Sequence, residues 1–595
     1  MIKARHTYDF GMIGNCSFLS YIDKRANIVW QCWPHFDSDF VFGSLIAGEK
    51  GGEFSISPAD DDYSSKQYYV KNTNVLVTEF YCKSGAFKVI DFAPRFGLYE
   101  RWHKPLKVFR KIQKISGNPV IKVVCNPVSQ YGEVKAEANL GGSNHITYTN
   151  LPFRLRLTTN VSLSDIIKEK SFLLTEDKYL VLSYNSKMEL PLKSTFEDFL
   201  QKTKDYWKTW IRHATLPNYF QSEVIRSALI LKLHQYEDTG AIIASGTTSL
   251  PEHPKAGRNW DYRYCWMRDA YFTLAALNSL SHFDEMEAYA HYIQNVFINA
   301  GDIMQPVYTI DGTASITENE INVSGYKDNK PVRIGNAAYH QIQNDVYGQV
   351  ILSILPLFID ERIKWDSDSL LEMVEKLLQK IDETLDQPDA GIWEYRAMKQ
   401  LHTGTLIFHW AGIKAVIKIA KQLEQESLLK KAEELLARAK KNIEDCFDQG
   451  DQAYKAYSGG DHYNASELLL ITMNYLKDSP QRAEKHLEVL EKNLKSEEGF
   501  IYRYRARDDF GDTHSAFMIC GFWYAEALAD VGRLEDAQEL FEKLISTSNH
   551  LGILSEDIDP TDSSQWGNFA QTYSHVGLIN TAFKINSKLD KLIFE

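Results

Sequence analysis

Two glutamates of this 595-residue chain have surroundings that suit acid–base chemistry. Glu394 lies between Trp393 and Tyr395, whose rings would exclude water and favour the protonated acid, whereas Arg396 nearby would favour the carboxylate. Glu556 lies in an acidic stretch whose negative charges would raise its affinity for a proton. Two carboxylates flanking a glycosidic bond are the minimum set for its hydrolysis, and a gap of about 6.5–9.5 Å between them predicts inversion. We therefore predict Glu394 as general acid and Glu556 as general base.

Each stretch also has a simpler interpretation. A Trp–Glu pair at a helix end is commonly a cap with packing, and SEDIDPTD (555–562) also fits a solvated turn or a weak calcium loop. The glycine and the ordering of an EF-hand loop are absent from it. We therefore expect no bound metal, and the predicted chemistry needs no cofactor.

The stretch RNWDYRYCWMRDA (258–270) mixes aromatic and charged residues densely. Aromatic rings stack on the apolar C–H faces of sugars, and arginine and aspartate form charge-assisted hydrogen bonds to hydroxyls. An ordinary cap and salt bridge would also explain Arg268 and Asp269. Because similar mixtures recur in five later stretches, we predict a pocket that binds a polyol ring.

The elements that must position these residues fall into two parts. Residues 1–194 contain short alternating runs, such as those at 120–125, 153–159 and 179–184, which predict an antiparallel β-sandwich. A helical linker is expected over 195–217. From 218 to 595 the apolar residues recur with the helical period.

Twelve helices are predicted in this second part. Short links alternate with long ones, so all the long loops emerge at one end, which favours a closed (α/α)6 barrel with one elaborated mouth. An open helical solenoid is the alternative, but no sequence motif repeats at a fixed period. The predicted helices are 221–235, 268–281, 284–299, 340–358, 367–386, 405–423, 426–447, 463–477, 480–494, 513–531, 533–548 and 566–584.

Composition excludes several classes of protein. The net charge of −13, with no basic run, argues against a nucleic-acid partner. The sequence contains no run of about 18 apolar residues, so no membrane span is predicted, and the first residues lack the apolar core of a signal peptide. The seven scattered cysteines fit reduced thiols, so we expect a cytoplasmic protein. The oligomeric state stays open.

Several long motifs resemble glycoside hydrolase family 15, which contains glucoamylases, glucodextranases and bacterial or archaeal trehalases. They are RNWDYRYCWMRDA, GIWEYR (391–396) and LSEDID (554–559) followed by QWGNFAQTYSHVGLI (565–579), in the family's order. Residues 13–46 are similar to the β-sandwich of the trehalase-like members. The resemblance covers nearly the whole chain, and it implies an (α/α)6 barrel and exo-acting, inverting release of β-glucose from a small-molecule α-glucoside.

The resemblance also implies roles for single residues. The family's acid falls on Glu394 and its base on Glu556. One difference is Tyr395, which stands where glucoamylases often carry a second acidic residue, so a preference for starch is in doubt. The positions expected to contact substrate are Trp260, Asp261, Arg268, Asp269, Trp393, Tyr395 and Arg396.

We therefore predict a glucoamylase-like hydrolase, with a trehalase of the same family as the alternative. An inverting sugar phosphorylase is more distant, because it needs a basic anion pocket and the loop around Glu556 is acidic. A non-catalytic carbohydrate-binding protein would lack the acid or the base, and both are present.

Overall fold

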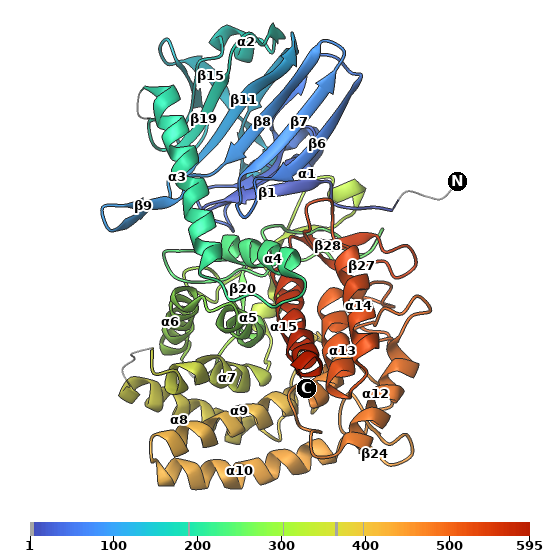
Figure 1. Cartoon of the computed structure of the whole chain (residues 1–595). Helices are drawn as coiled ribbons and strands as arrows, with labels where there is room; N and C mark the ends of the chain where they lie inside the picture. Colours follow the sequence, from blue (N-terminus) through green and yellow to red (C-terminus); the bar gives the residue numbers. More distant parts are fainter. Residues whose placement is uncertain (1–4, 189–190, 302, 363–366, 397, 595) are drawn as a thin grey trace.

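The computed structural model describes residues 5–188, 191–301, 303–362, 367–396 and 398–594. A β-rich part and a helical part lie one above the other, joined by the long helix α3 (Leu192–Arg212), which runs along the side of the β-rich part (Figure 1). Both predicted fold classes are confirmed.

The β-rich part is built from antiparallel sheets. Its large sheet runs, in spatial order, β15 (Glu137–Leu140), β16 (His145–Thr149), β17 (Leu155–Thr159), β19 (Lys178–Tyr184), β11 (Lys107–Gly117), β8 (Gly85–Phe92), β7 (Leu76–Cys82) and β6 (Tyr63–Tyr69). The facing strands are β1 (Phe10–Gly14), β2 (Leu19–Asp23), β3 (Ile28–Cys32) and β4 (Phe40–Phe42), with β18 (Phe172–Leu173), β12 (Val120–Asn126) and β5 (Glu53–Pro58). One apolar core, which includes Ile13, Phe54 and Val89, fills the space between them.

A fully buried ion pair lies in the large sheet, facing this core. Arg110 of β11 donates from Nε to Asp91 of β8 at 2.8 Å, and neither side chain is exposed. The same guanidinium donates to the carbonyl oxygens of Phe54 and Ala26, at 2.6 Å each. Arg110 therefore joins the two layers, and its charge depends on Asp91 for compensation.

Replacing Asp91 with alanine is expected to lower the free energy of unfolding by about 3–5 kcal/mol, because it leaves a buried charge without its partner. Denaturant unfolding, followed by circular dichroism, measures the change. Asp198→Ala is the matched control, since it breaks an exposed pair with Lys202 in which both side chains are close to half exposed, at 49% and 45%, and such pairs contribute about 0–1 kcal/mol. Equal losses in the two variants would contradict the interpretation of Arg110.

The helical part closes into a ring. The inner helices are α5 (Met267–Ser279), α7 (Asp345–Ile359), α9 (Thr403–Gln422), α11 (Leu469–Thr472), α13 (Met518–Asp530) and α15 (Thr572–Phe594). Each contacts the next, and α15 returns to α5. Outside them lie α4 (Gln221–His234), α6 (Phe283–Asn299), α8 (Ser367–Thr384), α10 (Glu426–Glu444), α12 (Pro480–Leu494) and α14 (Leu534–Ser546). This closed ring is an (α/α)6 barrel, so the open solenoid is excluded.

Inner and outer helices bury their residues differently. The inner helix α9 is buried along most of its length, whereas the outer helix α10 buries one stripe that includes Leu428, Leu435 and Ile443. The inner helices α7 and α9 also approach closely at Gly348, where a Cβ atom would lie 2.1 Å from the carbonyl oxygen of Phe408. Only glycine allows this contact.

Three predicted helices differ most from the structure. The helix expected at 513–531 begins only at Met518, because Ala516–Phe517 forms strand β26. The helix expected at 463–477 is a 3-10 turn, η5 (Ala465–Leu468), followed by the short α11, and Asn474 beyond it has φ +65°. The last helix begins at Thr572 rather than near 566, because Gln565–Phe569 forms strand β28. β28 pairs with β27 (Ser555–Ile558), which pairs with β26 (Ala516–Phe517). Glu556 therefore lies on a strand and not in a free loop.

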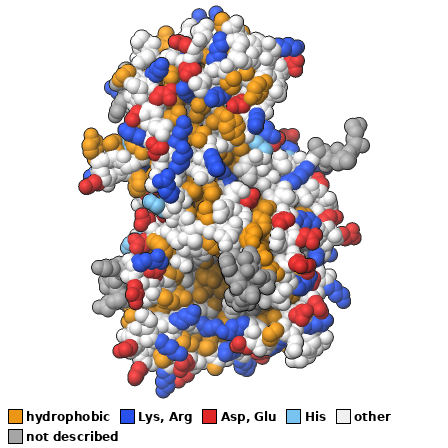
Figure 2. All heavy atoms as spheres, viewed as in Figure 1, with side chains coloured by type: hydrophobic (Ala, Val, Ile, Leu, Met, Phe, Trp, Pro, Cys, Tyr) orange, Lys and Arg blue, Asp and Glu red, His pale blue; other side chains and the backbone are white. Residues whose placement is uncertain are grey.

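The surface carries one projecting feature. The hairpin β9 (Phe96–Leu98) and β10 (Arg101–His103) extends sideways from the molecule, and apolar side chains colour it in the space-filling view (Figures 1 and 2). Tyr99 at its tip is 91% exposed.

None of the helices in the described part of the chain combines the length and apolar character that a membrane span requires.

Candidate active site

Glu394 is held by donors from two neighbouring segments. Its Oε1 accepts a 2.7 Å hydrogen bond from the indole of Trp266 and lies 3.3 Å from Nη1 of Arg268. The amide of Gln341 donates to its backbone oxygen at 3.2 Å. The backbone of Glu394 has φ +63°, and its side chain is 24% exposed, so the carboxylate is fixed yet accessible. This is what a proton donor to a bound ligand requires.

Glu556 is more deeply buried, with 1% exposure. Its Oε2 accepts a 2.9 Å hydrogen bond from the backbone N–H of Asn568, whereas its Oε1 has no hydrogen-bond partner among the described residues. Burial, and then the negative charge of Glu252, raise the pKa of Glu556. A buried carboxylate with one free oxygen and high proton affinity suits a general base.

Three carboxylates meet at this place. Oxygens of Glu252, Glu556 and Asp557 lie within 4.8 Å of one another, all in buried side chains. Arg503 lies 3.3 Å from Glu252, and the hydroxyl of Ser515 donates to Asp557 at 3.0 Å. Within the described part of the chain, this group alone has the spacing of a metal site. Arg503 already supplies positive charge there, so the remaining negative charge of the three carboxylates can be compensated by bound protons as well as by a metal cation.

Two small hollows are lined by most of the predicted residues, although Glu556 and Asp261 line neither of them. Both are lined by Tyr262, Trp393, Glu394 and Arg503, and Tyr262 also interacts with Glu556. Trp260, Tyr395 and Arg396 line the first hollow, and Arg268 and Asp269 line the second. Their volumes are about 50 and 30 Å³. About 10–15 Å³ of such space holds one water molecule, so each hollow is only a few water molecules in size.

Arg268 and Asp269 form the floor of the second hollow. Nε of Arg268 lies 3.7 Å from Oδ1 of Asp269, and that oxygen has no hydrogen-bond partner among the described residues. Burial raises the pKa of Asp269 to about 7, although Arg268 opposes the shift. Asp269 therefore has a hydrogen-bond acceptor that the described residues leave unused.

Trp260, Tyr395 and Arg396 line the rim of the first hollow. The guanidinium of Arg396 stacks 4.5 Å from the ring centre of Trp260, and Phe510 meets the same ring edge-on at 5.1 Å. The backbone N–H of Arg396 donates to Asp509 at 2.8 Å. These contacts tie the loop around residues 508–511 across the opening.

Asp261 is the exception among the predicted contacts. It is fully buried, its carboxylate binds Arg263 through hydrogen bonds of 2.9 and 2.7 Å, and it lines neither hollow. The backbone N–H of Gly335 donates to it as well, at 3.1 Å. We therefore interpret Asp261 as a structural residue that shapes the loop and not as a sugar contact.

Several functional candidates were not predicted from sequence. Trp266 and Tyr262 lie in the stretch at 258–270, so the same aromatic signal could have identified them. Arg503 belongs to a loop that mixes aromatic and charged residues. Glu252 had no local signal, because its partners come from distant segments.

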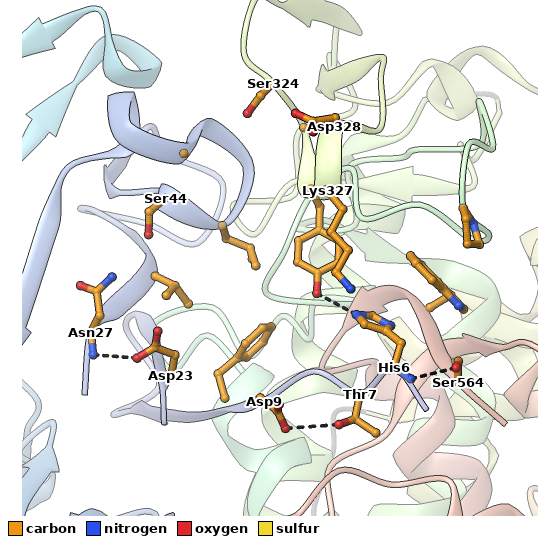
Figure 3. Close-up of a pocket in the computed structure, with 18 of the residues that line it drawn as sticks. His6, Thr7, Asp9, Asp23, Asn27, Ser44, Ser324, Lys327, Asp328 and Ser564 are labelled. Atoms are coloured by element: carbon orange, nitrogen blue, oxygen red, sulfur yellow. Dashed lines mark hydrogen bonds between the residues drawn. The ribbon is translucent and has the colours of Figure 1, made fainter. Parts of the chain in front are cut away.

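A much larger cavity lies elsewhere. It measures about 1090 Å³, opens between the N-terminal segment and the loops around residues 324–328 and 559–566, and contains none of the predicted catalytic residues (Figure 3). The N-terminal segment nevertheless supports the active site, since the hydroxyl of Tyr8 donates to the backbone oxygen of Gly567 at 2.8 Å. The sandwich thereby braces the strand beside Glu556.

The comparisons with known proteins agree along the whole chain. The sequence profile of glycosyl hydrolases family 15 matches residues 219–583, and that of a trehalase-like N-terminal domain matches residues 3–166. A trehalase of Thermoplasma volcanium is 31% identical over 98% of this chain and 94% of its own length. A trehalase of Mycolicibacterium smegmatis is 29% identical over 97% and 91%, respectively. A bacterial glucoamylase solved with acarbose shares the fold, with a TM-score of 0.70 and 15% identity over 98% of this chain and 94% of that one. The chain belongs to glycosyl hydrolase family 15 and is a glycoside hydrolase.

Proposed function

We propose that this protein is a trehalase, which hydrolyses α,α-trehalose with inversion at one anomeric carbon. The observation that carries the proposal is that relatives matching nearly the whole chain are named trehalases. The glucoamylase supports the fold alone, because it is only 15% identical. Trehalase therefore replaces glucoamylase as the favoured activity.

The proposed mechanism assigns one proton transfer to each glutamate. Arg268 and Asp269 hold the hydroxyls of one glucose unit. Glu394 gives its proton to the glycosidic oxygen as the bond to the anomeric carbon breaks. Glu556 accepts a proton from the water that attacks this carbon from the opposite face. The products are one β-glucose from the attacked unit and one α-glucose from the leaving unit, and exchange with solvent resets both carboxyl groups.

The narrow mouth favours a disaccharide over a polymer. Arg258 forms an ion pair with Asp508, Arg396 binds Asp509, and these contacts hold the loop of residues 508–511 across the opening. Tyr395 presents a buried ring where a second carboxylate would contact a longer glucan. A leaving group of one glucose fits this arrangement.

The test compares trehalose, maltose, isomaltose and maltotriose at equal concentrations, with NMR observation of the first glucose released. We expect kcat/KM for trehalose to exceed that for maltose at least about 100-fold, and α- and β-glucose to appear in equal amounts. Release of α-glucose alone would indicate retention. A preference for maltotriose would return the assignment to glucoamylase. A rate that requires phosphate would indicate phosphorolysis, which the buried carboxylates oppose.

A further inference from the structure

Glu252 is a buried carboxylate that the mechanism above does not use. It is 3% exposed and follows Pro251, whose carbonyl oxygen accepts a 2.7 Å hydrogen bond from the N–H of Gly567. The next N–H along β28, that of Asn568, donates to Glu556. Consecutive amides of one strand therefore fix the segment of Glu252 and the side chain of Glu556 beside each other.

The three carboxylates of the cluster have different partners. Glu252 lies 3.3 Å from Arg503 and 3.9 Å from Arg258, so two arginines compensate its negative charge. Asp557 receives the hydroxyl of Ser515, whereas Oε1 of Glu556 is free of protein partners within the described residues. The titratable groups that face Glu556 are Glu252, Asp557, Arg503, Tyr262 and Tyr8.

We propose that Glu252 is a positioning residue for the base: buried beside Glu556 and paired with Arg503, its negative charge directs the proton of the attacking water to Glu556. The inference rests on the role of Glu556 in the proposed function. The strength of the base is then set by a third carboxylate from a distant segment, which also lines the first hollow.

The pH dependence of turnover has a definite sign. Burial first, and Glu252 second, raise the pKa of Glu556. The base acts only when it is ionised, so kcat/KM falls as the pH drops through that pKa. Removal of the charge of Glu252 lowers the pKa of Glu556, so the acidic limb of the profile moves to lower pH.

The experiment measures kcat/KM against pH for the wild type and for Glu252→Gln on whichever α-glucoside is the better substrate. We expect the acidic limb to shift down by about one pH unit, and kcat on the plateau to fall by about tenfold or less, because a weaker base still accepts the proton. Glu252→Asp keeps the charge and should restore the wild-type limb. If Gln prevents folding, Glu252→Ser makes the same charge change and leaves room for water beside Arg503.

Glu491→Gln is the matched control. It makes the same change at a carboxylate that pairs with Arg533 at 2.9 Å but lies outside the cluster and lines neither hollow, so its acidic limb should stay at the wild-type position. A limb that Glu252→Gln leaves in place, or that both variants shift equally, would overturn the role of Glu252. Near-normal turnover of Glu556→Gln would instead overturn the base on which the inference rests.

A metal site is the competing explanation, and it is tested in the same assay. Wild type and Glu252→Gln are dialysed against EDTA and assayed with and without Mg²⁺. We expect both to keep their rates after chelation. If the wild type needs Mg²⁺ and the variant no longer responds to it, the cluster holds a cation and the proposal fails.

Discussion

Glu394→Gln is expected to lower kcat for trehalose by about 10²–10⁴-fold with little change in KM. The amide can still receive the indole hydrogen bond of Trp266, so the position of the side chain is kept while its acidic proton is lost. The loss should depend on the leaving group. Fluoride leaves from α-glucosyl fluoride without protonation by an acid. The variant should therefore lose much less activity, relative to the wild type, on this substrate than on trehalose. Steady-state kinetics with both substrates measure this difference.

Glu320→Gln is the matched control for this prediction. Its carboxylate is 66% exposed, lies 3.7 Å from Arg333 and lines neither hollow, so both substrates should be turned over at wild-type rates. Equal losses on trehalose and on the fluoride in Glu394→Gln would show that Glu394 does not donate the proton. The acid would then have to be sought elsewhere in the two hollows.

The sequence predicts the architecture well where periodicity is long. The helices at 221–235, 284–299 and 480–494 match α4, α6 and α12 closely, because α6 and α12 carry an apolar stripe and α4 is buried throughout its second half. It fails where tertiary contacts decide the backbone. The segment 565–569 is short and fully buried, so its sequence suits the start of a helix and a strand equally. Pairing with β27 selects the strand.

The site shows the same limit. Arg268 and Asp269 at the start of α5 both line the second hollow, and their contact with substrate stays a prediction. Asp261 belongs to the same motif, yet its partner is Arg263, two residues away, which turns it from the pocket. Glu252 is the opposite case, since its contacts to Glu556 and Arg503 exist only in three dimensions. A local sequence pattern identifies which residue types are present, but it does not identify the residues that each of them contacts in the folded protein.

Glu556→Ala is expected to lower kcat by about 10²–10⁴-fold on trehalose and on α-glucosyl fluoride alike, since attack by water needs the base whatever the leaving group. The shorter side chain leaves a space beside the N–H of Asn568, which can receive a small anion. Azide added to the variant should occupy it and attack the anomeric carbon directly, without proton removal. The product expected from inversion is β-glucosyl azide, identified by NMR, with turnover that rises with azide concentration.

Asp557→Ala decides between the two neighbouring acids. Asp557 follows Glu556 on β27 and also has an oxygen without a partner among the described residues. Its other oxygen, however, accepts a hydrogen bond from the hydroxyl of Ser515. The carboxylates of Glu556 and Asp557 lie within 4.8 Å of each other, but Ser515 holds that of Asp557, so Asp557→Ala should not gain turnover from azide. If azide rescues Asp557→Ala and not Glu556→Ala, the base is Asp557. Glu556 would then be its charged neighbour, and the roles within the cluster would be exchanged while the acid at Glu394 stays the same.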